Sequence, residues 1–345
     1  MIYLILVEDW DMFEAFLEYL YKAKLGSDSK LHPMLMSEAP WNQKLKREKT
    51  AELMFEKFDV PAFFLCKNAV LVAFSNGRSN GLILDSGATH TSAVPVYDGF
   101  CCANAIAKVA LAGDSMTQQC TNMLGHRGIE LVPRYEVQSK EPTDASRSPK
   151  WSKRATLPDV TKSYRNYMIR DVVEDFKAAT LQLSDATLDP EATESIQALP
   201  YEFPTGQTQE FGADRVRVPE GLFDLSYLKD LPPEQRPFMT IPQVVHTSIG
   251  MCDIDMKPAM FQGIIVTGGN TLVPGFVERL TFELQQKCPA NAKLRISAVP
   301  TPAERRYGAW VGGSILASLG TFQQMWVSRS EYDETGKTIV DKKCP

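Results

Sequence analysis

The chain has 345 residues, of which 44% are hydrophobic and 23% are charged, and its formal net charge at pH 7 is −5. This length suffices for one large two-lobed body, or for two domains that each have a core of their own. The acidic balance excludes a protein whose whole surface binds nucleic acid or anionic membrane, because both need dense positive charge.

The first third of the chain is predicted to alternate helices with short strands. Residues 1–7 are apolar, but the run is too short for a signal peptide or a membrane helix and predicts a core segment. Asp9 is placed to cap the first helix, and Gly77 is placed to end the third. The predicted elements are helices over 9–21, 41–58 and 68–74, and strands over 34–36, 61–65, 81–85 and 91–96.

The middle of the chain is less regular, and order returns near residue 263. Residues 141–159 are rich in Pro, Ser and basic residues and predict a mobile surface loop, and residues 188–199 predict an acidic loop. Alternating strands and helices without a long repeat indicate the α/β class. The later predicted elements are helices over 161–183, 275–287 and 303–319, and strands over 263–267 and 293–297.

Two segments share one design, in which an apolar strand runs into a turn of small residues and then a threonine. They are Leu82–Thr89 and Ile264–Thr271. Turns of this kind let backbone N–H groups converge on a phosphate, and Asp85 is placed to hold a metal-bound water. Glycine turns after buried strands also serve as plain connections, so the sequence leaves both interpretations open.

Other candidate motifs do not meet their chemical requirements. Gly336–Thr338 lacks the preceding glycine of a P-loop, because that position is Glu331. The seven cysteines contain no C-x-x-C pair and the four histidines have no ligand spacing, so reduced thiols and no metal site are predicted. The basic stretch Lys150–Arg154 is either a nuclear import signal or a charged loop.

In order and spacing, the two glycine turns resemble those of actin and its relatives, and the resemblance covers essentially the whole chain. It implies an actin-like, two-lobed α/β fold of the ribonuclease H-like and Hsp70 ATPase type, with the first lobe incomplete at the N-terminus. Residues 134–240 depart furthest from the family. The segments that carry the resemblance include His32–Pro40, Lys46–Lys49, Val60–Ala62, Gly250–Asp255, Trp310–Leu319, Thr321–Trp326 and Lys343–Pro345.

The resemblance also implies how the chain divides. A partial subdomain 1 comprises residues 1–75 and 308–345, and subdomain 3 comprises 76–111 and 237–307. Subdomain 4 comprises 112–236. Subdomain 2 is expected to be absent, because the sequence begins after the family's first phosphate loop and the small subdomain that follows it.

Within the family, several segments resemble the nuclear actin-like subunit of BAF (SWI/SNF)-type chromatin-remodelling and histone acetyltransferase complexes. They are Ser37–Asn42, Ala62–Lys67, Leu84–Thr91, Tyr201–Pro204 and Pro219–Asp224. This resemblance implies a non-catalytic nuclear protein of transcription regulation that pairs with actin on a helical segment of the remodelling ATPase, alongside other complex subunits. It implies no direct sequence-specific nucleic-acid binding and no membrane contact. The alternative is an actin-like cytoskeletal protein that binds and hydrolyses ATP.

For the site, the resemblance implies a degenerate nucleotide cleft for ATP or ADP, without catalytic residues. The family's water-orienting glutamine and histidine positions fall on Asn68 and Ser92, and Ala88 replaces a metal-side aspartate, so hydrolysis is not expected. The implied nucleotide-binding residues are Asp85, Ser86, Gly87, Glu174, Gly268, Gly269, Asn270 and Arg306.

The resemblance further implies a groove at the base of the molecule that accepts an amphipathic helix. It would be lined by Phe74, Ile315, Leu316, Leu319 and Met325. The same side chains would also suit an ordinary hydrophobic core.

Overall fold

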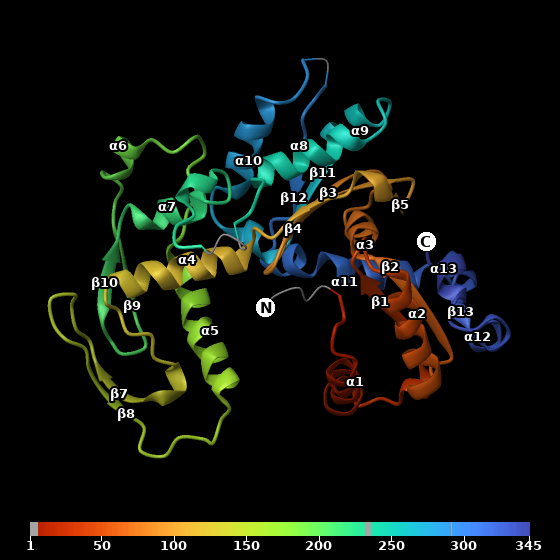
Figure 1. The fold of residues 1–345 in the computed structure, drawn as a ribbon, viewed down its shortest axis with the longest axis horizontal. Helices are drawn as coiled ribbons and strands as arrows, with labels where there is room; N and C mark the ends of the chain where they lie inside the picture. The colour runs from red at the N-terminus through yellow and green to blue at the C-terminus, as the bar shows by residue number, and fades with distance from the viewer. Residues whose placement is uncertain (1–5, 232–235, 291) are drawn as a thin grey trace.

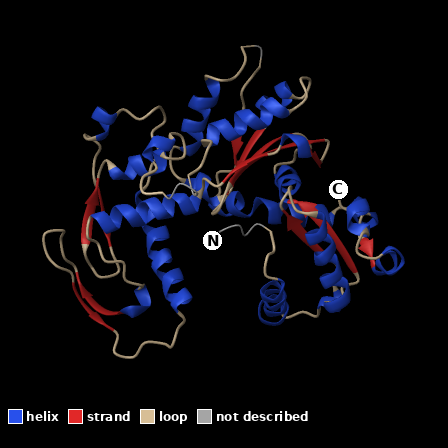
Figure 2. Ribbon diagram, viewed as in Figure 1, coloured by secondary structure: helices blue, strands red, loops and turns tan. Residues whose placement is uncertain are grey.

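The structure is a computed structural model that describes residues 6–231, 236–290 and 292–345. It is a two-lobed α/β molecule in which helices surround several small sheets (Figures 1 and 2). Of the core segment predicted over residues 1–7, residues 1–5 lie outside this description. No helix among the described residues is long and apolar enough to cross a membrane.

The first lobe is built from both ends of the described chain (Figure 1). Its three-stranded sheet has the order β1-β2-β13, with β1 parallel and β13 antiparallel to β2. Its elements are α1 (Trp10–Tyr19), β1 (Met34–Glu38), α2 (Lys44–Glu52), β2 (Ala62–Lys67), α3 (Asn68–Ser75), β13 (Val327–Ser328), α12 (Arg329–Thr335) and α13 (Ile339–Lys343).

The centre of the molecule is a six-stranded sheet of order β12-β11-β3-β4-β5, with β6 also paired to β4. β11 is parallel to β3 and β12, and β3 and β4 form the antiparallel hairpin that the sequence predicts. The elements here are β3 (Gly81–Ser86), β4 (Thr91–Tyr97), β5 (Phe100–Cys101), β6 (Ala107–Val109), α8 (Ile241–Met251), α9 (Lys257–Gln262), β11 (Ile264–Thr267), α10 (Phe276–Gln285), β12 (Ile296–Ala298) and α11 (Pro302–Ser318).

The remaining elements form the outer part of the second lobe, on the left in Figure 1. Two helices, α4 and α5, support two separate two-stranded sheets of order β7-β8 and β10-β9. The elements are α4 (Gly113–His126), β7 (Val137–Glu141), β8 (Lys150–Lys153), α5 (Lys162–Thr180), α6 (Pro190–Thr193), β9 (Leu199–Glu202), β10 (Thr208–Phe211) and α7 (Asp214–Glu220).

Strand β3 separates two hydrophobic cores. Leu82 and Leu84 pack into the core of the second lobe, whereas Ile83 points to the opposite face and packs into the core of the first. Successive side chains of a strand point to opposite faces, so a strand buried on both faces must be apolar throughout. This explains why the sequence shows a continuous apolar run here and not an alternating pattern.

Three predicted segments differ from the structure. The helix predicted from residue 41 begins at Lys44, because a turn closed by a 3.0 Å hydrogen bond from Asn42 N–H to the Ala39 carbonyl precedes it. The acidic loop predicted over 188–199 contains α6, which Asp189 caps. The prediction of a mobile loop over 141–159 is wrong at residues 150–153, which form β8 and pair with β7. Both strands are largely exposed, so their sequences show no alternation of apolar and polar residues.

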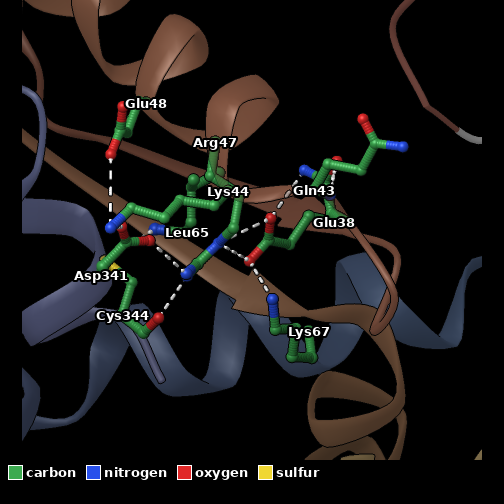
Figure 3. Close-up of polar contacts among 10 residues, drawn as sticks. Glu38, Gln43, Lys44, Arg47, Glu48, Leu65, Lys67, Asp341 and Cys344 are labelled. Carbon is green, nitrogen blue, oxygen red and sulfur yellow. Dashed lines mark hydrogen bonds and ion pairs between the residues drawn. The ribbon is translucent and has the colours of Figure 1, made fainter.

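A buried network of charges ties the C-terminal helix to the first sheet (Figure 3). Arg47 Nε donates to Glu38 Oε1 at 2.9 Å, and its Nη1 donates to Asp341 Oδ1 at 2.9 Å. Lys67 Nζ donates to the same Glu38 oxygen at 2.6 Å, and Arg47 Nη2 donates to the Cys344 carbonyl oxygen. Lys44 Nζ lies 3.4 Å from Asp341 Oδ2 and 3.8 Å from Glu48 Oε1. Three cations thus face three carboxylates, so the low-dielectric site holds no uncompensated charge.

Helices α3 and α11 approach each other so closely that only glycine fits between them. A Cβ atom added at Gly312 would lie 1.7 Å from the backbone oxygen of Leu71. The same addition at Gly308 would lie 3.4 Å from Thr267 Oγ1 at the end of β11. The small residues of α11 therefore seat it against both the first lobe and the central sheet.

We expect Gly312→Ala to destabilise the protein by about 3 kcal/mol, the upper end of overpacking costs, because the helix backbones must separate. Gly250→Ala is the matched control, since it also lies in a helix but a Cβ there meets nothing within 4 Å. Denaturant unfolding of both variants measures the difference. Equal stability of the two variants would contradict the close approach of α3 and α11.

Candidate functional site

The two glycine turns meet at the carboxyl ends of neighbouring parallel strands. Thr267 of β11 lies opposite Asp85 of β3 in the parallel register, and each strand then enters its turn. Gly268 has a φ of 95°, and a Cβ there would lie 2.2 Å from the Ser86 carbonyl oxygen. Glycine is therefore required at 268, and the carboxyl end of such strands is where α/β proteins bind ligands.

A chain of hydrogen bonds joins the two turns. Asn270 Nδ2 lies 3.0 Å from Ser86 Oγ, which lies 2.7 Å from Thr91 Oγ1. Thr91 Oγ1 donates to the Leu111 carbonyl oxygen at 2.6 Å, so each hydroxyl can donate to the next acceptor. The buried Oδ1 of Asn270 has no hydrogen-bond partner among the described residues. An acceptor without a donor is costly to bury, which suits a site that receives a ligand or water.

The N-terminus of α4 packs against the first glycine turn. Gly113 N–H donates to the Gly87 carbonyl oxygen at 3.1 Å, and Asp114 N–H donates to that of Ala88 at 2.7 Å. A Cβ at Gly113 would lie 3.2 Å from the Gly87 oxygen, so a larger residue would press on the turn.

Glu174, on α5, is held at the side of the same space. Its Oε1 accepts a 2.6 Å hydrogen bond from Thr117, and its Oε2 lies 2.6 Å from Lys177 Nζ. Burial opposes ionisation of Glu174, but the bonds from Lys177 and Thr117 outweigh it and hold its pKa below the usual range. Glu174 is therefore an anion whose oxygens already have partners.

These elements surround a cleft of about 730 Å³. Five of the predicted nucleotide-binding residues line it: Gly87, Glu174, Gly269, Asn270 and Arg306. The other three, Asp85, Ser86 and Gly268, lie in the strand ends and turns but are not among the lining residues.

Sequence reasoning missed several residues of the cleft wall. Gly113, Arg134 and Lys177 line it, and Thr117 holds Glu174 in place. The only local sequence signal among them is Gly113, a glycine at the start of α4. Arg134, Lys177 and Thr117 come from segments that are far apart in the chain.

The glycine turns of the cleft fit the phosphates of a nucleotide. Gly87, Gly113 and Gly269 bring backbone close to the cavity, and Arg306 adds a positive charge, whereas Lys177 is paired with Glu174. No group of three or more potential metal ligands occurs in the part of the chain that the structure describes.

Asp85 lies at the end of β3, where the first glycine turn begins. Asn68 Nδ2 lies 3.3 Å from Asp85 Oδ2, and Ser92 lies directly opposite Asp85 in the β3–β4 ladder. Burial raises the pKa of Asp85 to about 6, because the charged form loses its hydration.

His90 is packed next to the turn and held neutral. Its ring lies edge-on to Trp41 at 5.1 Å, and its Nδ1 shares a 3.1 Å hydrogen bond with Thr89. Burial and the nearby Lys108 lower the pKa of His90 to about 4. A neutral imidazole is therefore present at physiological pH.

The predicted partner groove is only partly exposed. Ile315, Leu319 and Met325 are 41%, 42% and 43% exposed, and the first two lie one helical turn apart at the end of α11. Leu316 is 6% exposed and packs in the core of the first lobe, because consecutive helical residues point about 100° apart. Phe74 is half-buried against the same core. The apolar surface here thus comes from three of the five predicted residues.

The raised pKa of Asp85 predicts a pH-dependent cost to stability. Between about pH 4 and pH 6 the folded protein binds more protons at this carboxyl than the unfolded chain, so stability falls as pH rises through that window. We expect the change in the free energy of unfolding caused by Asp85→Asn to be more favourable at about pH 8 than at about pH 4, because the substitution removes a carboxylate that is costly to bury when charged. Denaturant unfolding at the two pH values measures it. Asp255→Asn, at an exposed carboxyl, is the control; the same pH dependence in both variants would contradict the prediction.

Comparisons with known proteins agree on one family. The sequence model of the actin family matches residues 5–345. The chain is 38% identical over 347 residues to actin-related protein 4 of Arabidopsis thaliana, covering 99% of this chain and 78% of that protein. It is 36% identical over 348 residues to actin-related protein 4 of Yarrowia lipolytica, with coverage of 98% and 78%. It is 35% identical over 344 residues to that of Oryza sativa subsp. indica, with coverage of 98% and 77%.

Proposed function

Since the chain belongs to the actin family, we propose that it is a non-catalytic actin-related subunit of nuclear chromatin-remodelling and histone-modifying complexes. In such a complex it pairs with actin on a helical segment of the remodelling ATPase and helps to regulate transcription. The observation that carries the proposal is the similarity, over 98–99% of this chain, to proteins named actin-related protein 4. The proposed subdomain division is the one given by the family resemblance.

The exposed end of α11 supports binding of a helical partner. Ile315 and Leu319 are spaced four residues apart, and Met325 follows after the short 3₁₀ helix Gly320–Gln324. Amphipathic helices dock on such surfaces through apolar anchors at helical spacing. The chain's net charge of −5 favours a chromatin role through protein partners over direct binding of DNA.

Partner capture tests this proposal. Affinity purification of the tagged full chain from nuclear extract, followed by mass spectrometry, should recover actin and a remodelling ATPase in similar amounts. Ile315→Asp with Leu319→Asp should lose the ATPase, because charges replace the apolar anchors. Met12→Asp with Phe16→Asp, on the exposed face of α1, is the matched control and should retain it. Recovery of chaperones alone, or equal losses in both double variants, would contradict the proposal.

We further propose that the cleft binds ATP or ADP and hydrolyses ATP poorly. Gly87, Gly113 and Gly269 support the binding, and Arg306 and Lys177 supply charge beside them. Against hydrolysis, the position opposite Asp85 is Ser92 and the side chain bonded to Asp85 is Asn68. Neither residue is a strong base.

Two measurements separate binding from turnover. A fluorescent ATP analogue should bind the full chain, and Arg306→Glu should weaken that binding while Arg147→Glu, on an exposed loop, should not. Phosphate release should be at least about 10²-fold slower than for actin, because positioned bases contribute factors of this size. Turnover that matches actin would favour the alternative, a hydrolysing cytoskeletal protein.

A further inference from the structure

A second cavity, of about 420 Å³, lies between the two small sheets of the outer lobe. Arg134 and residues 137–140 line one side of it, and residues 202–204 line the other. It is separate from the nucleotide cleft except that Arg134 borders both. Its volume falls within the range of about 300–1,000 Å³ typical of binding pockets.

The cavity follows the edge of β7 rather than one face of it. Four consecutive residues, Val137 to Lys140, line the cavity, whereas the residues on one face of a strand would be every second one. Within the described chain, β7 pairs with β8 and β9 pairs with β10, and neither pairs with a further strand. An edge of this kind presents backbone donors and acceptors that an extended peptide can pair with.

The two sheets meet at one end of the cavity. Thr143 N–H donates to the Gly206 carbonyl oxygen at 2.9 Å, and Thr208 N–H donates to that of Thr143 at 2.8 Å. Gly206 has a φ of 83°, and a Cβ there would lie 2.5 Å from the Glu141 oxygen. This close contact closes one end of the cavity between β7 and the turn after β9.

The groove combines an apolar floor with a positively charged rim. Phe203 is 1% exposed and forms an apolar floor together with the half-buried Val137. Arg134 and Lys140 supply positive charge at the rim, and their present partners, Asp175 and Glu202, are exposed carboxylates. Exposed ion pairs are weak, so a ligand carboxylate can exchange for them at little cost.

The charge of the surrounding segment favours an acidic ligand. Residues 134–165 contain eight Lys or Arg and four Asp or Glu, a net charge of +4 in a chain whose total is −5. This segment includes the β7–β8 hairpin at the outer end of the lobe (Figure 1). Such a local excess attracts acidic partners and selects against basic ones.

We propose that this groove binds an extended acidic peptide segment of a partner protein, which adds a strand to the free edge of β7. Alternate side chains of the peptide contact Val137 and Phe203, and its carboxylates pair with Arg134 and Lys140. The free edge of a strand recognises peptide backbone by adding a strand to the sheet.

Peptide display against the full chain tests the proposal. Selection from a library of short linear peptides, with counter-selection on Arg134→Glu/Lys140→Glu, should enrich sequences that alternate Asp or Glu with apolar residues. A selected peptide should bind that variant about tenfold more weakly or worse. The variant Arg147→Glu/Lys150→Glu is the matched control, because it makes the same charge change on exposed residues outside the cavity and should bind nearly as well as the parent chain.

Hydrogen exchange provides the second readout. Adding the peptide should slow exchange of the backbone amides of residues 137–141, which a contact through side chains alone would not do. If Arg134→Glu/Lys140→Glu fails to fold, Lys140→Met replaces it. No enrichment, equal losses in the two charge variants, preference for basic peptides or for an oligonucleotide, or unchanged exchange in β7 would each overturn the proposal.

Discussion

The contact between α3 and α11 is the constraint on which the rest of the structure depends. At Gly312 the backbone of α11 lies so near the Leu71 carbonyl that no Cβ fits, and at Gly308 the helix packs on Thr267. Arg306 lines the cleft near one end of this helix, and Leu319 lies exposed just past the other end. The rise of an α-helix places these two residues about 20 Å apart. The helix, which is kinked at Tyr307, therefore runs from the cleft to the surface proposed for a helical partner.

The two lobes offer different surfaces for partners. The end of α11 presents apolar side chains on the first lobe, whereas the β7 edge presents backbone groups and positive charge at the outer end of the second. They differ in the partner each suits, an amphipathic helix in one case and an acidic strand in the other. Because the two surfaces belong to different lobes, the helical partner and the acidic peptide proposed for them would not compete for one site.

The sequence predicts best where local chemistry decides the structure. β3, β4 and β11 were predictable because each is buried on both faces. The second glycine turn was predictable because Gly268 must adopt a positive φ. The β7–β8 hairpin could not be predicted, because exposed strands show no apolar alternation. Lys177 and Thr117 could not be predicted as site residues, because their roles depend on α4 and α5 lying side by side, and no local pattern encodes that contact. Likewise, the spacing along α11 indicates an apolar partner face but does not separate exposed Ile315 from buried Leu316.

The side chains around Asp85 support the proposal that the cleft holds a nucleotide and hydrolyses it poorly. A base that activates water must be exposed enough to reach the water and accept its proton, and the groups around Asp85 are either not basic or buried. The Asn68 amide bonds to Asp85, and Ser92 is buried in the strand ladder. His90 is packed against Trp41 with its Nδ1 bonded to Thr89, and its Nε2 is buried without a hydrogen-bond partner among the described residues. Burial brings the pKa of Asp85 close to neutrality, which weakens it as a fixed negative charge for a metal-bound water. Under that proposal, a bound nucleotide would act as a structural element and not as a substrate that is turned over.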